Sequence, residues 1–163
     1  TGEGWVLSGL VVASYDERPI DVRYRATVDE GWATRSVVVT VDQLKQPRRL
    51  ELDRSSDGNW TVVGLAAPEL DGCVDVDLGV TPSTNTLPIR RLDLDVGAQE
   101  EIEVAWVRFP DLRVERGRQH YARIAAELWR YSSGDFTADL IVDEVGLVIR
   151  YGADLWQQVA MRR

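Results

Sequence analysis

The stretch IDVRYRATV, residues 20–28, alternates apolar and polar side chains without a break. Successive side chains of a β-strand point to opposite faces of its sheet, so the apolar ones share one face. The residues predicted on that buried face are Ile20, Val22, Tyr24, Ala26 and Val28. Arg23 and Arg25 occupy the opposite face. The stretch therefore predicts an amphipathic strand with one face in the core and the other in solvent.

The same alternation recurs on both sides of this strand. Further strands are predicted at residues 5–12, 35–41, 49–53, 60–63, 73–78, 101–109, 136–142 and 147–151. Turn sequences such as Ser56-Asp57-Gly58-Asn59 and Ser133-Gly134-Asp135 separate them. Because these connections are too short for the helical crossovers that parallel strands need, the order indicates an antiparallel meander.

Two segments carry a helical spacing. In residues 118–131 the apolar side chains that recur at this spacing are Tyr121, Ile124, Ala125, Leu128 and Trp129. The same segment also fits two strands around a turn at residues 125–127, which would continue the meander. At the end of the chain, one helical turn is predicted from Leu155, Trp156 and Val159.

Composition limits the classes of protein to consider. The chain has 163 residues, 44% of them hydrophobic, and we expect residues 1–163 to form a single domain with an ordinary core. Its formal net charge of −8 argues against nucleic acid and anionic membrane surfaces as partners. The one cysteine, Cys73, cannot form an internal disulfide, which fits a reducing cytoplasm. No apolar run approaches the roughly 18 residues of a membrane span, so stable membrane insertion is not expected.

The residues that usually carry catalysis are sparse. His120 is the sole histidine, and acidic neighbours on the predicted strand should raise the pKa of the Cys73 thiol, so neither a Cys-His pair nor a histidine metal site is predicted. Asp75 and Asp77 alternate on that strand, preceded by Asp71. We favour an arrangement in which these acids lie on the solvent-exposed side of an edge strand and face arginines on the neighbouring strand, over a Ca²⁺ site. We predict no metal and no cofactor. Two such carboxylates would also suit hydrolysis of a glycosidic bond, which leaves an enzyme as an alternative.

The chain resembles a bacterial family described as putative glycolipid-binding, formerly a domain of unknown function. The resemblance extends over nearly the whole chain. The matching segments are Val22-Arg23-Tyr24-Arg25, Gly31-Trp32 with Thr34-Arg35, residues 71–78, Thr81-Pro82, residues 84–92, Gln119 with Tyr121, residues 136–140, Val142-Asp143 and residues 146–148. It implies a mainly β, twisted antiparallel sheet curled into an incompletely closed barrel, similar to periplasmic carriers of lipoproteins and lipids. It implies no catalytic residues, and it favours two strands over a helix in residues 118–131.

A charge-free segment of residues 81–88 suits the rim of such a barrel, because its hydroxyl and amide groups could bind a head group while two prolines limit its freedom. The alternative is a structural loop whose side chains cap their own backbone. We expect residues 84–87 to leave the sheet and border the largest apolar pocket, and substitution of Thr84 and Asn85 by Ala to weaken binding with little loss of stability. The candidate ligand-binding residues are Trp32, Trp106, Trp129, Tyr121, Thr84, Asn85, Arg90 and Arg91.

The six tryptophans leave two interpretations open, core filling or a ligand-facing role for at least two of them. The leading hypothesis is non-catalytic binding of an amphipathic lipid or glycolipid on a concave apolar face, with an arginine pairing with a phosphate or carboxylate. The alternatives are a carboxylate-dependent enzyme on a sugar or lipid head group, and a scaffold that forms a homodimer through a sheet edge.

Overall fold

A computed structural model describes residues 4–158, which fold into two sheets. The first sheet has six antiparallel strands in chain order, so each strand pairs with the one before it. Its strands are β1 (Trp5–Tyr15), β2 (Arg18–Val28), β3 (Thr34–Gln43), β4 (Gln46–Arg54), β5 (Trp60–Val62) and β6 (Leu65–Ala66).

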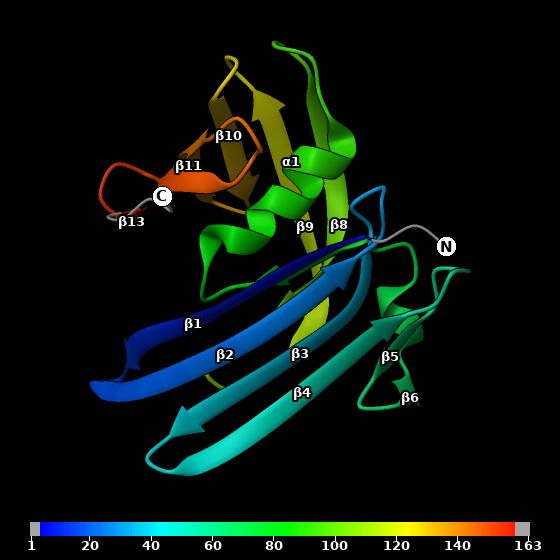
Figure 1. Ribbon diagram of the computed structural model, residues 1–163, viewed down its shortest axis with the longest axis vertical. Coiled ribbons are helices and arrows are strands. Elements are labelled where there is room, and N and C mark those ends of the chain that lie inside the picture. The colour runs from blue at the N-terminus through cyan, green and yellow to red at the C-terminus, as the bar shows by residue number, and fades with distance from the viewer. Residues whose placement is uncertain (1–3, 159–163) are drawn as a thin grey trace.

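The second sheet has seven strands in the order β13-β12-β11-β10-β9-β8-β7 and curls into an open half-barrel. Its strands are β7 (Asp75–Leu78), β8 (Gln99–Val107), β9 (Val114–Arg123), β10 (Leu128–Ser133), β11 (Phe136–Val142), β12 (Val148–Tyr151) and β13 (Trp156–Gln157). The short helices are η1 (Pro68–Leu70), η2 (Pro82–Asn85) and α1 (Thr86–Leu92), and α1 lies between the half-barrel and the edge of the first sheet (Figure 1). The prediction of a mainly β, incompletely closed barrel is confirmed.

Strand β2 has the predicted faces. Ile20, Val22, Ala26 and Val28 are buried and Tyr24 is partly buried, whereas the arginines between them are exposed. This alternation follows from packing the first sheet over the rest of the molecule on one side only, because a charged guanidinium on the inner face would lose its hydration.

The helical spacing in residues 118–131 does not form a helix. The segment forms β9, a turn and β10, as the family resemblance predicts, and Tyr131 pairs with Tyr121 across the hairpin. Tyr121, Trp129 and Tyr131 are buried on one face of the sheet, while Ile124, which a helical stripe would bury, is 43% exposed. The period of two therefore prevails over the period of 3.6.

The connection between β7 and β8 departs from a meander. These two strands are parallel, and η2 and α1 form the crossover between them. The predicted polar loop at residues 84–87 is thus helical. Pro82 stands at the start of η2, where a missing N–H costs nothing, and the Oγ1 of Thr81 caps the same helix by accepting from the N–H of Ser83.

The prediction for the C-terminal tail is wrong within the described residues. Leu155 ends a turn and Trp156 begins strand β13, so no helical turn forms there. Val159 lies outside the described residues.

Two clusters of apolar side chains meet at β8. Ala105 and Val107 point into a cluster shared with the first sheet, while Ile102 and Val104 point into a cluster inside the half-barrel. Leu87 and Ile89 of α1 divide in the same way. Strand β8 is therefore a wall with a core on each side, and α1 fills the half-barrel from within.

Candidate aromatic pocket at the mouth of the half-barrel

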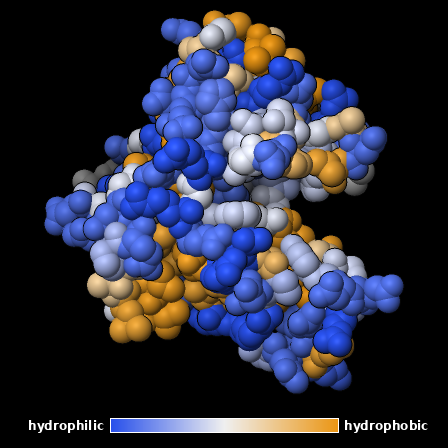
Figure 2. Space-filling view, turned by 180° about the vertical axis from the view of Figure 1, so that it is seen from behind, coloured by the Kyte–Doolittle hydropathy of each residue, from blue (hydrophilic) through white to orange (hydrophobic). Residues whose placement is uncertain are grey.

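A pocket of about 430 Å³ opens between η2 and the strands of the half-barrel. The aromatic side chains that line it are Trp106, Tyr131, Phe136, Tyr151 and Trp156, from strands β8, β10, β11, β12 and β13. Asp77 and Asn85 line it as well. The surface is hollowed on the side where β12 and β13 lie above the first sheet (Figure 2).

Strand pairing brings three of these rings together. Ser133 of β10 pairs with Phe136 of β11, and Leu140 of β11 pairs with Tyr151 of β12, so alternate side chains meet on the inner face. The rings of Phe136 and Tyr151 stack with centroids 6.1 Å apart and planes 12° from parallel. Tyr131 lies 6.1 Å from the ring of Phe136 and 6.2 Å from that of Tyr151. Burial raises the pKa of both tyrosines, which keeps their hydroxyls protonated.

Two glycines make room for the indole of Trp106. A Cβ on Gly79 would lie 2.9 Å from the Nε1 of Trp106, and a Cβ on Gly117 would lie 3.3 Å from its Cβ. A larger residue at Gly79 would displace the indole from this wall of the pocket. Small residues on the neighbouring segments therefore fix the position of the tryptophan.

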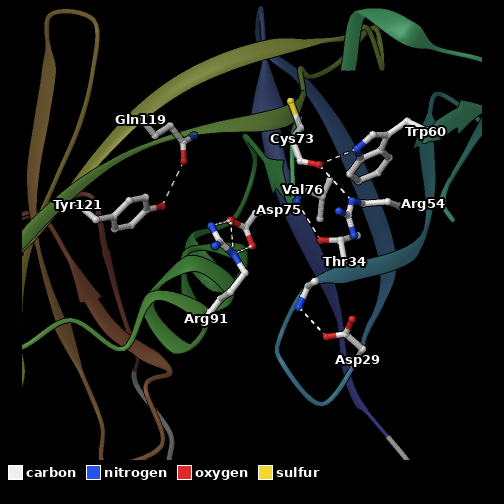
Figure 3. A network of polar contacts seen from close by, with 11 residues as sticks. Asp29, Thr34, Arg54, Trp60, Cys73, Asp75, Val76, Arg91, Gln119 and Tyr121 are labelled. Carbon is white, nitrogen blue, oxygen red and sulfur yellow. Dashed lines mark hydrogen bonds and ion pairs between the residues drawn. The ribbon is translucent and has the colours of Figure 1, made fainter. Parts of the chain in front are cut away.

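A chain of hydrogen bonds leads from Asn85 to Asp77 behind the aromatic lining. The Nδ2 of Asn85 donates to the hydroxyl of Tyr121 over 2.8 Å. That hydroxyl donates to the Oε1 of Gln119 over 3.3 Å (Figure 3). The Nε2 of Gln119 then donates to the Oδ2 of Asp77 over 2.6 Å. Tyr121 and Gln119 are buried, so the chain fixes the two residues at its ends.

Asp77 is half-buried, and burial raises the pKa of its carboxyl to about 6. The hydrogen bonds from Gln119 and Thr84 oppose that shift. No Lys, Arg or His is among the described residues that line the pocket. At neutral pH the pocket thus presents one negative charge in a largely aromatic wall, an arrangement common at binding sites.

Asp75, two residues away, has a different environment. Its carboxylate is fully buried and accepts from the guanidinium of Arg91 in a two-pronged ion pair, with Nη2 2.7 Å from Oδ2 (Figure 3). Burial raises the pKa of Asp75, and Arg91 opposes the shift. The prediction that Asp75 lies on a solvent-exposed strand face is wrong, because its side chain is buried. The arginine that pairs with it comes from α1 and not from a neighbouring strand. No cluster of His, Cys, Asp or Glu among residues 4–158 is suited to hold a metal ion.

The candidate residues proposed from sequence fall into separate places. Asn85 and Trp106 line the pocket, and Tyr121 holds Asn85 from behind. Trp129 is buried in the half-barrel, and Arg91 is held by Asp75. Trp32 stacks on Trp5 and lies under the guanidinium of Arg90, in contacts that involve none of the pocket residues.

Thr84 is structural. It is 1% exposed, and its Oγ1 accepts from the backbone N–H of Leu78 over 3.1 Å. It does not line the pocket, and because it is buried and hydrogen-bonded we now expect its replacement by Ala to cost stability. Thr84 thus fits the alternative of a structural segment whose side chains hydrogen-bond to backbone groups. Asn85, in contrast, lines a pocket.

That pocket is not the largest hollow. One of about 740 Å³ lies on the outer face of β11 and β12, but none of the described residues that line it is aromatic, and Asp139 at its border is paired with Arg130. We therefore take the aromatic pocket as the candidate site. Sequence reasoning missed Tyr131, Phe136, Tyr151 and Trp156 as site residues, although Phe136 and Tyr151 stand in predicted strands.

Cys73 is inert. The thiol is buried in the cluster shared with the first sheet, and burial raises its pKa to about 11. The predicted direction of this shift is confirmed, but its main cause is burial and not the neighbouring acids.

Comparison with known proteins agrees with this architecture. A family described as "putative glycolipid-binding" matches residues 1–158. The chain belongs to this family. Among curated proteins, none matches it.

A member of the DUF1089 family from Pseudomonas aeruginosa, known from a crystal structure, is 32% identical, with a TM-score of 0.85. The similarity covers 98% of this chain and 94% of that one. Among the described residues, no helix has the length and apolar character to cross a bilayer.

Proposed function

We propose that this member of the family binds a glycolipid or a similar amphipathic lipid at the mouth of the half-barrel, without catalysis. The observation that carries the proposal is the aromatic pocket, in which five rings surround one carboxylate and one amide. Ligand pockets are typically lined by aromatic side chains, with a few polar groups that orient the ligand. The family description supports the same class of ligand.

The size of the pocket suits one part of such a molecule. Its 430 Å³ lies near the lower end of the roughly 300–1,000 Å³ that small-molecule sites occupy. We infer that the head group enters the pocket while the acyl chain lies along Val80, Pro82 and Leu155 at its border. Each methylene removed from water there would contribute about 0.8 kcal/mol.

The enzyme alternative has less support. Hydrolysis of a glycoside commonly uses two carboxyl groups on either side of the bond, and among the described lining residues only Asp77 supplies one. Asp75 is already paired with Arg91. The dimer alternative rests on β1, which pairs with β2 alone in the described sheet, and size-exclusion chromatography would test it.

Native mass spectrometry tests the proposal directly. The protein would be incubated with vesicles of a bacterial lipid extract, separated from them, and weighed without denaturation. We expect lipid adducts on the wild type and a loss of most of them in a Phe136→Ala, Tyr151→Ala double variant, because two stacked rings of the pocket are gone. Trp5→Ala removes an exposed aromatic side chain outside the pocket and should keep the adducts. Absence of adducts on the wild type, or equal loss in both variants, would contradict the proposal.

A further inference from the structure

The hydrogen bonds behind the pocket fix which polar atoms of this chain donate and which accept. An ionised carboxylate only accepts, so Gln119 must turn its Nε2 toward Asp77 and its Oε1 toward Tyr121. The hydroxyl of Tyr121 gives its proton to that Oε1 and must accept from the Nδ2 of Asn85. The Oδ1 of Asn85 is left as an acceptor. The negative charge of Asp77 therefore sets the orientation of every group up to Asn85.

The charged residues around the pocket also favour a ligand that donates hydrogen bonds and carries no negative charge. Asp77 is the one ionisable carboxylate among the described lining residues, and no cation accompanies it there. The arginines proposed from sequence for an anionic head group are engaged elsewhere, Arg91 with Asp75 and Arg90 over Trp32. Arg108 does stack on Trp106, 4.7 Å from its ring centroid, but it is paired at 3.1 Å with Glu115, a carboxylate that it shares with Arg113. A phosphate or carboxylate in the pocket would meet Asp77 without a free cation to offset it.

From these observations we propose that the pocket selects an uncharged sugar head group, whose hydroxyls donate to Asp77 and Asn85 while its ring packs on the aromatic wall. The inference rests on the proposed function and names the class of head group. A sugar suits the site because it offers several O–H donors on a compact ring with apolar C–H faces. A hydroxyl that donates to a carboxylate forms a hydrogen bond about twice as strong as one between neutral groups.

A quaternary ammonium is the other head group that aromatic rings and a carboxylate attract. It has no proton to donate, so Asn85 and the end of its hydrogen-bond chain would have no role in holding it. The built orientation of Asn85 favours the sugar.

Four probes with the same alkyl chain separate these cases: decyl glucoside, decyl glucuronide, decyl phosphate and decyltrimethylammonium. Each would be titrated below its micelle concentration at neutral pH by calorimetry. We expect the glucoside to bind at least about tenfold more tightly than the two anionic probes, the effect of roughly one unfavourable charge contact. The variant Asp77→Asn should weaken glucoside binding about fivefold to tenfold. It should also reduce the difference in affinity between the glucoside and the glucuronide.

The control variant is Asp139→Asn, which removes a carboxylate on the outer face of the sheet, where it is paired with Arg130. It should leave all four affinities unchanged. Equal binding of all probes by the wild type would overturn the inference while leaving lipid binding intact, since the chain alone would then be recognised. Tightest binding of decyltrimethylammonium would also overturn it. If no probe binds, the proposed function itself fails.

Discussion

Asp77 is a carboxylate that the fold keeps at a cost. Its pKa of about 6 lies above the ordinary value of 3.8, mainly because burial disfavours the charged form. Asp75 nearby shows the opposite solution, in which a bidentate arginine compensates a buried charge. A residue that destabilises its own fold and faces a pocket is a good candidate for binding, since selection for stability alone would remove it.

The first prediction follows from this pKa. Between about pH 4 and pH 6 the folded protein holds a proton on Asp77 that the unfolded chain has released, so wild-type stability should fall as the pH rises through this window. Asp77→Asn lacks this ionisation. We expect the variant to exceed the wild type in free energy of unfolding by about 1–3 kcal/mol at neutral pH, an advantage that shrinks as the pH falls from about 6 to about 4 and is lost below that.

Urea unfolding at a series of pH values would measure the effect. Asp139→Asn is a control of opposite sign, because the ion pair with Arg130 lowers the pKa of Asp139. The substitution Asp139→Asn should lower the free energy of unfolding at neutral pH, and this loss should disappear in acid, where Asp139 is protonated. A gap between Asp77→Asn and the wild type that does not change with pH would mean that Asp77 is not strained in the folded protein.

At the scale of elements, α1 is anchored by the ion pair between Arg91 and Asp75. The carboxylate is 0% exposed and the arginine side chain 21%, so the carboxylate has no water to replace its partner. Strand β7 is fixed from its other side as well, because the N–H of Val76 donates to the Oγ1 of Thr34 in the first sheet (Figure 3). The helix that plugs the half-barrel is thus connected through one short strand to both sheets.

We predict that Arg91→Gln lowers the free energy of unfolding by about 3–5 kcal/mol, because it leaves a buried carboxylate without its ion-pair partner. Arg90→Gln is the matched control, since Arg90 is the adjacent residue on the same helix and is exposed. Its substitution should change stability by less than about 1 kcal/mol even though it removes the contact with Trp32. Chemical denaturation compares the two. Equal effects would show that the ion pair contributes nothing specific.

Sequence periodicity predicts elements that bury one face, and it succeeds for β2. It fails where long-range contacts decide, as in residues 79–98, because the pairing of β7 with β8 and the pairing of Asp75 with Arg91 leave no local pattern. The helical spacing of residues 118–131 is overridden by strand pairing on both sides of the hairpin, with β8 and with β11. Of the residues that line the pocket, the sequence predicts Asn85 and Trp106 as ligand-binding residues. The convergence of Phe136 and Tyr151 depends on the curl of the sheet, which no residue pattern specifies.

At the scale of the whole molecule, the two sheets share one wall. Strand β8 contributes Val107 to the core under the first sheet and Val104 to the core of the half-barrel. Both side chains are 1% exposed or less. Unfolding of either core would expose one face of β8 and release β7, which carries Asp77 and lies between the sheets. The pocket therefore depends on both cores, although its aromatic rings all belong to the second sheet.

This shared wall predicts a single cooperative unfolding transition. Val107→Ala and Val104→Ala should each cost about 1–3 kcal/mol, the transfer and cavity cost of truncating a buried aliphatic side chain. Either substitution should lower the hydrogen-exchange protection of the most protected amides in β3 and in β10 and β11 by the same amount, because both sheets lose their wall together. If Val104→Ala weakened protection only in β10 and β11, the half-barrel would be a separate folding unit. The pocket would then open without disturbing the first sheet, and ligand affinity should follow the stability of the half-barrel alone.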